Sequence, residues 1–204
     1  MRKIFTILFI VISFYLYSED KIIKLDNKTI ILHDDFTWNY IEVEKNEIST
    51  EMILKYDPNE TILLRSKNNK YNIHINDENW VQTTGLNDGA QFQFVNKDDT
   101  GYGMLIYEGL SFPLKSLKEA IITNANAIDP NARIIDVKEC AVNNTVGEIV
   151  TYMASYSGLD FIFYTYITTS DKGTIQFTFY TLEEKFEELK PSFINAISGF
   201  EFKK

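Results

Sequence analysis

Four stretches with strand character follow one another between residues 133 and 180, and only very short turns separate them. Connections of three or four residues join antiparallel neighbours, because a parallel crossover needs a dozen residues or more. In the last stretch Ile175, Phe177 and Phe179 alternate with polar residues, which predicts one buried face and one more polar face. The stretches are 133–142, 146–156, 161–169 and 174–180, with turns at 143–145, 157–160 and 170–173.

Two amphipathic segments flank this meander. Residues 114–128 carry apolar side chains at spacings of three, four and seven, and Ser116 with Glu119 matches a capping box. A single apolar stripe follows the meander. At its start, Thr181 and Glu184 match a second capping box. Both segments are predicted as helices. The stripe consists of Leu182, Phe186, Leu189, Phe193, Ile197 and Phe200.

The order of elements predicts one α+β domain over residues 61–204, which contains antiparallel strands and two helices. Strand-like runs precede the first helix, separated by polar turns. Together with the meander and the two helices they provide the elements of one domain in this chain of 204 residues. The early runs are 62–64, 71–75, 90–94 and 103–107.

Residues 1–18 have the pattern of a secretory signal peptide. Arg2 and Lys3 precede the apolar run Ile4–Tyr17, and the small residue Ser18 stands before a charged stretch. Fourteen helical residues extend only ~21 Å, which is less than the ~30 Å of a bilayer's hydrocarbon core. We therefore expect an exported protein, periplasmic or extracellular, with no membrane span after signal cleavage. The alternative is an uncleaved anchor.

Between the signal and the main domain, residues 19–43 are predicted to form a small β-hairpin element. Residues 28–40 resemble a short element of exported bacterial proteins, in which an apolar strand leads into Asp-Asp-Gly-Thr-Trp and an aromatic residue. Here Phe36 stands where that element has glycine. Residues 44–60 are largely polar and are predicted to be a linker, in which Met52–Leu54 could form one helical turn.

The composition excludes several classes of function. A net charge of −9 argues against a nucleic-acid partner, which would require a basic face. One cysteine and two histidines exclude internal disulfides and cysteine- or histidine-rich metal sites. His74 lies opposite in phase to Ile73 and Ile75 and is interpreted as a structural residue of a strand. The sequence contains no glycine-rich phosphate loop and no nucleophile elbow. We predict no catalytic, cofactor-binding or metal-binding residues.

Residues 71–204 resemble the PsbP/Mog1 fold family, which includes exported bacterial proteins of the DcrB kind. The order of elements agrees, and three local patterns match. A polar turn precedes Trp80, residues 142–147 resemble a Val-Asn-Gly turn with Asn144 at the glycine position, and residues 197–200 resemble the family's ending in a small residue and Phe. The resemblance implies an antiparallel sheet flanked by helices, as an α/β/α sandwich, and a non-catalytic interaction module.

Three large aromatic residues are the candidate interaction residues. Trp38 and Tyr40 lie in an element too small to bury them alone, and Trp80 follows a turn. Large aromatic side chains at strand ends often anchor interfaces. The alternative is that these residues are structural, and Trp80 in particular could fill the edge of the core.

Three functional hypotheses follow. The first is an exported, non-enzymatic protein of the bacterial envelope that binds another envelope protein, acting as a monomer without a cofactor. The second is a module that binds a small molecule or a metal ion in a pocket between sheet and helix. The third is a hydrolase with a carboxylate site that the sequence does not reveal, which would need an acidic pair in a deep cleft.

Overall fold

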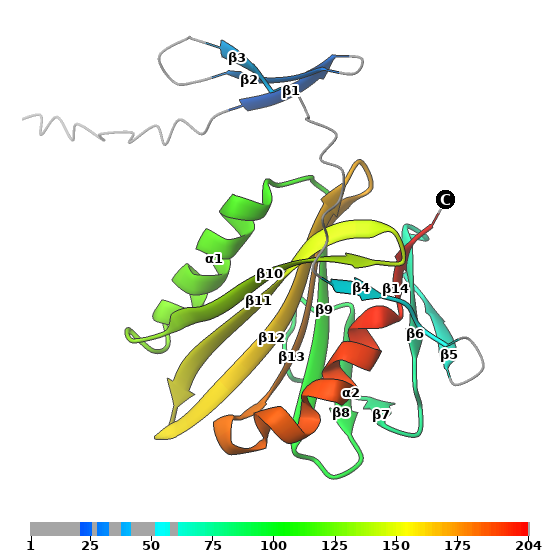
Figure 1. Ribbon diagram of the computed structural model, residues 1–204, viewed down its shortest axis with the longest axis vertical. Coiled ribbons are helices and arrows are strands. Elements are labelled where there is room, and N and C mark those ends of the chain that lie inside the picture. Colours follow the sequence, from blue (N-terminus) through cyan, green and yellow to red (C-terminus); the bar gives the residue numbers. More distant parts are fainter. Residues whose placement is uncertain (1–20, 26–27, 33–37, 42–51, 58–60, 204) are drawn as a thin grey trace, which may run out of the picture. The chain divides into compact units, whose positions relative to one another are not determined.

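The computed structural model describes residues 21–25, 28–32, 38–41, 52–57 and 61–203 (Figure 1). The chain divides into two compact units, Met1–Ser49 and Thr50–Lys204. In the first unit, the described residues form an antiparallel sheet in the order β1-β2-β3. Its three strands lie within the residues that the sequence predicts as a small β-hairpin element. They are β1 (Lys21–Leu25), β2 (Lys28–Leu32) and β3 (Trp38–Ile41).

An eight-stranded sheet dominates the second unit, in the order β4-β10-β11-β12-β13-β9-β8-β7. The predicted meander forms its centre, and each of its strands pairs antiparallel with the next. The strands are β4 (Met52–Leu54), β7 (Trp80–Gln82), β8 (Phe92–Asn96), β9 (Gly101–Glu108), β10 (Arg133–Val142), β11 (Thr145–Tyr156), β12 (Leu159–Ser170) and β13 (Gly173–Leu182).

Strand β4 makes this sheet mixed instead of purely antiparallel. Met52–Leu54 pair parallel with Cys140–Val142 at the sheet edge, where the sequence predicts a helical turn within a linker. A three-residue apolar run has no periodicity that separates helix from strand. The pairing with β10 decides its conformation.

A second, smaller sheet joins distant parts of the chain in the order β14-β6-β5. Its strands are β5 (Ile62–Arg65), β6 (Tyr71–Ile75) and β14 (Phe200–Phe202). Phe200 pairs with Ile73, so the last residue of the predicted helical stripe belongs to a strand. Gly199 separates the helix from this strand and allows close backbone contact with His74, whose N–H donates to the Gly199 carbonyl oxygen (2.8 Å).

Two helices complete the unit, and both predicted capping boxes are absent. Helix α1 spans Leu114–Asn126, and α2 spans Phe186–Ser198 after a 3-10 turn at Glu183–Lys185. Neither helix has a side-chain cap at its start. The Thr181 hydroxyl instead donates to the carbonyl oxygen of Thr100 at 2.7 Å. Of the helices in the described residues, none combines the length and apolar character that crossing a bilayer requires.

Each face of the large sheet carries its own core. On one face α1 buries Leu117 and Ile121 against Val150 and Ile167. On the opposite face α2 and the small sheet together bury a larger, aromatic cluster that includes Trp80, Phe179 and Phe193. One helix therefore lies on each face, but the small sheet covers part of the α2 face, so the predicted flanking of the sheet by helices is confirmed only in part.

Candidate functional site

The structure brings the three candidate aromatic residues to two different units. Trp38 and Tyr40 lie in β3, opposite Leu32 and Ile30 of β2, and their side chains are outside the described part of the structure. Trp80 begins β7 in the second unit. Their role as interaction residues stays a prediction for Trp38 and Tyr40.

Trp80 lies in the core, in agreement with the alternative that it is a structural residue. Its side chain is only 2% exposed. The ring packs against Phe179 and Phe193, with centroid distances of 4.7 and 5.9 Å. A ring buried on this scale has no free face for a partner, so Trp80 stabilises the core under α2.

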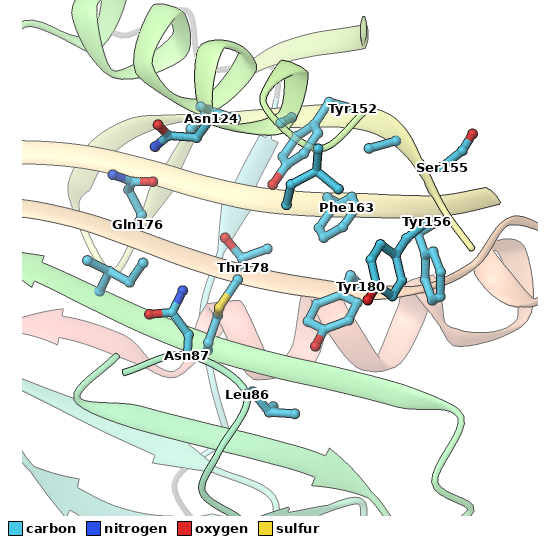
Figure 2. Close-up of a pocket in the computed structure, with 17 residues that line it drawn as sticks. Leu86, Asn87, Asn124, Tyr152, Ser155, Tyr156, Phe163, Gln176, Thr178 and Tyr180 are labelled. Atoms are coloured by element: carbon cyan, nitrogen blue, oxygen red, sulfur yellow. The ribbon is translucent and has the colours of Figure 1, made fainter. Parts of the chain in front are cut away.

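A cavity of about 470 Å³ lies on the other face of the sheet, between α1 and the strands (Figure 2). We call it the α1 cavity. Helix α1 contacts β11 and β12, so the neighbouring part of this face lies beside the helix and not beneath it. Asn124, Ile128 and Tyr156 line the cavity and are exposed, which shows that it opens to the surface.

Apolar side chains and amides line the α1 cavity, and charged side chains are absent from its described lining. Ile128, which the sequence predicts on the buried stripe of the first helix, lies beyond the end of α1 and is 67% exposed at the cavity mouth. The lining residues are Leu86, Asn87, Met104, Ile106, Ile121, Asn124, Ala125, Ile128, Tyr152, Ala154, Ser155, Tyr156, Phe161, Phe163, Gln176, Thr178 and Tyr180.

A row of stacked aromatic rings crosses the floor of the cavity and continues beyond it. Strand register places Tyr152 opposite Phe163, Phe163 opposite Tyr180, and Tyr180 opposite Tyr102. The ring centroids are 4.7, 5.1 and 5.3 Å apart in that order. Cross-strand aromatic pairs stabilise a sheet and fix its register. The row gives the cavity a rigid apolar surface.

The tyrosines of this row are neutral hydrogen-bonding groups at physiological pH. Burial raises the pKa of Tyr152, and it also raises the pKa of Tyr180 and of Tyr102. A phenol with a raised pKa carries its proton at neutral pH and does not serve as a base. These hydroxyls can orient a ligand, but they are poorly suited to acid–base catalysis.

Two amides face the cavity without a hydrogen-bond partner among the described residues. Asn124 comes from α1 and Gln176 from β13, and Figure 2 shows both on the side of the cavity opposite the Tyr156 ring. Within the described residues, neither side chain forms a hydrogen bond. Asn87, on the loop after β7, instead accepts a hydrogen bond from the Gly89 N–H at 2.8 Å.

Polar contacts hold α1 at the edge of the cavity. The Lys118 ammonium lies 2.7 Å from a carboxylate oxygen of Glu148 in β11, and both side chains are mostly buried. Past the C-terminal end of the helix, Asp129 accepts hydrogen bonds from the N–H groups of Ser155 (2.8 Å) and Asn131 (2.9 Å). These two bonds lower the pKa of Asp129. The helix is thereby tied to β11 at two points.

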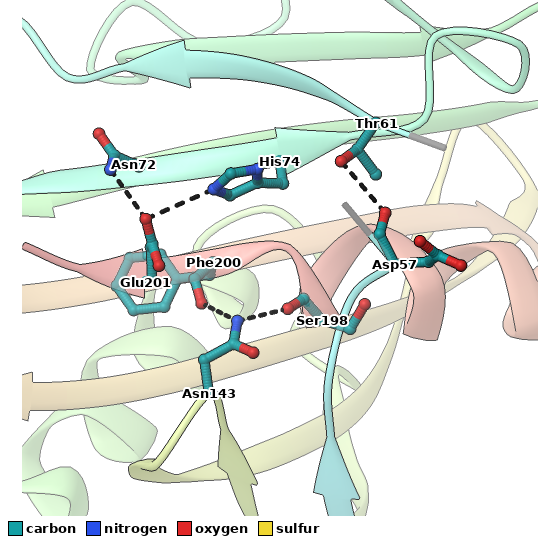
Figure 3. Close-up of polar contacts among 8 residues, drawn as sticks. All are labelled: Asp57, Thr61, Asn72, His74, Asn143, Ser198, Phe200 and Glu201. Carbon is teal, nitrogen blue, oxygen red and sulfur yellow. Dashed lines mark hydrogen bonds and ion pairs between the residues drawn. The ribbon is translucent and has the colours of Figure 1, made fainter. Parts of the chain in front are cut away.

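A second polar cluster connects β6 and β14, and its contacts are structural (Figure 3). His74 stacks on Tyr56 with ring centroids 4.0 Å apart, and its Nε2 lies 3.4 Å from Glu201 Oε1. The same oxygen accepts a hydrogen bond from Asn72 at 2.8 Å. These contacts join the segment after β4 to the small sheet, in agreement with the structural interpretation of His74.

Asn143 completes the link between the meander and the C-terminal strand. Its side-chain amide donates to the carbonyl oxygens of Ser198 and Phe200, both at 2.7 Å (Figure 3). Asn143 and Asn144 both have positive φ, 47° and 66°, as a two-residue I′ hairpin turn requires. Asparagine tolerates this conformation, which explains how Asn144 can stand where the family pattern has glycine.

The residues of the α1 cavity were not singled out by sequence reasoning. Tyr152, Phe163 and Tyr180 lie on three different strands, and only the register of those strands brings them together. The sequence pattern predicts which residues alternate between the two faces of each strand. It does not predict the register between strands, nor how much of the sheet α1 covers. No group of three metal-ligating side chains occurs in the described part of the chain.

Comparison with solved structures shows the fold. The NMR structure of PsbP (CyanoP) from Synechocystis sp. PCC 6803 matches with a TM-score of 0.54 and 13% identity, over 71% of this chain and 93% of that chain. LpqN of Mycobacterium tuberculosis, described as involved in cell envelope biogenesis, matches with a TM-score of 0.49 and 9% identity, over 70% and 90% of the two chains. No family model and no curated protein matches the sequence.

Proposed function

We propose that this chain, which has a PsbP-like fold, is an exported, non-enzymatic binding module of the bacterial envelope that docks another envelope protein. The observation that carries the proposal is an exposed apolar edge beside the α1 cavity. We call this edge the apolar rim and define it as Ile128, Tyr156 and Leu159. Their exposed fractions are 67%, 66% and 52%.

The position of the apolar rim supports a docking role. Tyr156 and Leu159 face each other across the turn between β11 and β12, and Tyr156 and Ile128 both line the cavity mouth. Exposed apolar side chains that gather at a hollow, instead of being scattered singly, are typical of protein contact sites. A partner that covers the rim would bury three large side chains at once.

The chemistry of the described residues favours binding over catalysis. The described lining of the cavity contains no carboxylate, histidine, lysine or cysteine, and burial raises the pKa of Tyr152 and of Tyr180. Cys140 is fully buried, and burial raises its pKa to about 12, so that it is not a thiolate nucleophile. The hydrolase alternative would require an acidic pair in a cleft, which the α1 cavity does not supply.

The proposal of export depends on residues 1–18, with their basic start, apolar run and small residue before Glu19. We propose a periplasmic or extracellular monomer. A simple fractionation of cells that produce the full chain tests this part separately. Recovery of the whole chain in the cytoplasm, with its N-terminus intact, would contradict it.

Site-specific photo-crosslinking in intact cells tests the docking role. A photoreactive amino acid replaces Tyr156 or Leu159 in a tagged copy that keeps its own N-terminus. We expect the same envelope protein to be captured from both positions. Asn68, exposed in the turn between β5 and β6, is the matched control position and should not capture it.

The double substitution Tyr156→Ser and Leu159→Ser extends the test. It should abolish capture of that partner through a crosslinker at position 128 while leaving the urea unfolding midpoint close to that of the parent. If a folded, exported protein gives no rim-dependent product from any of the three positions, the docking proposal fails.

A further inference from the structure

We propose that the α1 cavity is a binding site for a small, uncharged amphipathic molecule with an apolar chain and a hydrogen-bonding polar head. The apolar chain would lie on the aromatic row, and the head would face the amides of Asn124 and Gln176. This inference goes beyond docking at the apolar rim, because it concerns the interior of the cavity and needs no protein partner.

The size of the cavity suits a small molecule. Ligand sites are mostly hollows of roughly 300–1,000 Å³ lined by apolar and aromatic side chains with a few polar groups. The α1 cavity, at about 470 Å³, falls in this range. Its floor is a sheet and one wall is a helix held by Lys118 and Asp129, so it is formed before any ligand arrives.

The charge of the lining restricts the ligand. The chain carries 49 acidic and basic residues among 204, but none of those in the described residues lines the cavity. A phosphate, sulfate or carboxylate group would find no arginine or lysine, and a cation would find no carboxylate. Moving a charged group out of water without a partner costs much more than moving a neutral one. The ligand is therefore neutral.

The polarity of the lining changes along β13 and gives the ligand a direction. Gln176, Thr178 and Tyr180 point to the same face, since they alternate in the strand. They present an amide, a hydroxyl and a ring in that order, over ~13 Å from first to last at ~3.3 Å per residue. Figure 2 shows the Asn124 and Gln176 amides at one side and the Phe163, Tyr180 and Tyr156 rings at the other. An amphipathic molecule can therefore place its polar head at the amides and its apolar chain on the aromatic rings.

The free amides supply the second requirement of a site, which is specific polar recognition. Each of these side chains offers two N–H donors and one carbonyl acceptor. Because Asn124 and Gln176 form no hydrogen bond within the described residues, their groups remain available. Hydroxyl or amide groups on a ligand head both donate and accept, as these side chains require.

A matched series of probes tests the charge and the shape together. Octyl glucoside and 1-octanoylglycerol are neutral, octyl sulfate is anionic and octyltrimethylammonium is cationic, and all share an eight-carbon chain. Methyl glucoside has the head without the chain. Binding to the full chain is followed below the micelle-forming concentration by NMR shift changes and by thermal shift.

We expect at least one neutral octyl probe to bind with shift changes at the cavity residues. The two charged probes should bind at least tenfold more weakly, and methyl glucoside should give no measurable binding. Equal or tighter binding of a charged probe, or no binding of either neutral one, would overturn the proposal.

Substitutions locate the site. Gln176→Leu removes one amide and should lower the affinity for the neutral probe roughly 3- to 10-fold, which corresponds to the loss of one net hydrogen bond. Asn126→Leu changes an exposed amide of the same helix that does not line the cavity, and it should leave the affinity unchanged. Ala154→Phe fills the cavity and should abolish binding without lowering the melting temperature by more than a few degrees.

If the Ala154→Phe variant is unstable, Ala125→Leu places a smaller side chain in the cavity from α1, and loss of binding is measured in the same way. Binding that persists in a folded, filled variant would show that the probe lies elsewhere, and the proposal would fail. Capture of a protein at the apolar rim is measured separately, so either proposal can fail while the other stands.

Discussion

At the scale of single residues, Gly199 shows how closely two backbones meet in this fold. A Cβ atom at this position would lie nearer to the His74 carbonyl group than real Cβ contacts allow. Its φ is −78°, so the need for glycine comes from the approach of β6 and not from an unusual backbone conformation. This explains in physical terms why a small residue stands before Phe200.

Gly199→Ala is therefore expected to lower the free energy of unfolding by at least about 2 kcal/mol, the cost of forcing extra volume into a packed site. Urea unfolding followed by circular dichroism measures the change. Gly109→Ala is the control, since a Cβ there meets no atom closer than 3.8 Å, and its effect should stay within about 0.5 kcal/mol. Equal stability of the Gly199→Ala variant would mean that β6 and β14 are not held together as described.

Trp38 and Trp80 should behave differently when each is shortened. Trp80→Ala removes a core ring and is expected to cost about 3–5 kcal/mol. Trp38→Ala, in the separate first unit, should leave the unfolding of the second unit unchanged but weaken capture of the envelope partner. Both variants are compared by urea unfolding and by crosslinking yield. If Trp38→Ala unfolds the second unit as well, Trp38 is a structural residue.

At the scale of elements, α1 depends on its polar contacts with β11 for its position beside the cavity. Asp129 is ionised in the folded state to a lower pH than in the unfolded chain, because the Ser155 and Asn131 N–H groups stabilise its charge. A lowered folded pKa contributes stability above the ordinary aspartate pKa of ~3.9. That contribution is lost as the pH falls through the folded value.

Asp129→Asn is accordingly expected to reduce stability at neutral pH and to flatten the loss of stability below about pH 4. Urea unfolding at a series of pH values between 7 and 3 measures both effects. Asp88→Asn, at an exposed position without a hydrogen bond to its side chain in the described residues, should follow the parent curve. Parallel acid profiles for the parent and the Asp129→Asn variant would show that this carboxylate does not hold α1.

Elements with strong periodicity were predicted well, and elements that depend on distant partners were not. The meander, β6 and both helices lie within a few residues of their predicted positions, since alternation and helical spacing are local properties. Strand β4 was assigned to a linker because three apolar residues are too few to show the periodicity of a strand or a helix. Both predictions of a capping box were wrong. The Thr181 hydroxyl donates to the Thr100 carbonyl oxygen instead, and α1 begins directly after Pro113.

At the scale of the whole molecule, β4 raises the question of where the folding unit begins. The sequence predicts a domain of residues 61–204, but Met52–Leu54 complete the large sheet and Asn143 donates its N–H to the Leu54 carbonyl oxygen at 3.1 Å. Met52 and Leu54 also pack against the main core. A chain that lacks these residues would expose the edge of β10.

Two truncations distinguish these boundaries. A chain of residues 50–204 should unfold like the second unit of the full protein. A chain of residues 61–204 should be less stable by about 2 kcal/mol or more, because two partly buried apolar side chains are lost. Cys140 is fully buried opposite Met52, so its thiol should react with a thiol reagent much faster in the shorter chain. Equal reactivity and stability would support the boundary at residue 61.

The PsbP-like architecture could be predicted, whereas the candidate site could not. Element order over residues 71–204 was enough for the fold, as the likeness to CyanoP confirms. The α1 cavity arises because a thirteen-residue helix has its main contacts with β11 and β12 and leaves part of a wider face uncovered. Its described lining comes from four strands, one helix and two loops, and no local pattern in the sequence marks those residues as neighbours.

The pairing of β6 with β14 has a consequence for how the chain is made. Residues 71–75 pair with β5 on one side and with residues 200–202 on the other, and the Asn143 side chain donates to the carbonyl groups of Ser198 and Phe200. A nascent chain therefore cannot complete its main core until residues 198–202 have left the ribosome. Before that point the small sheet lacks β14, and an incompletely folded chain is the form that a protein-conducting channel can thread.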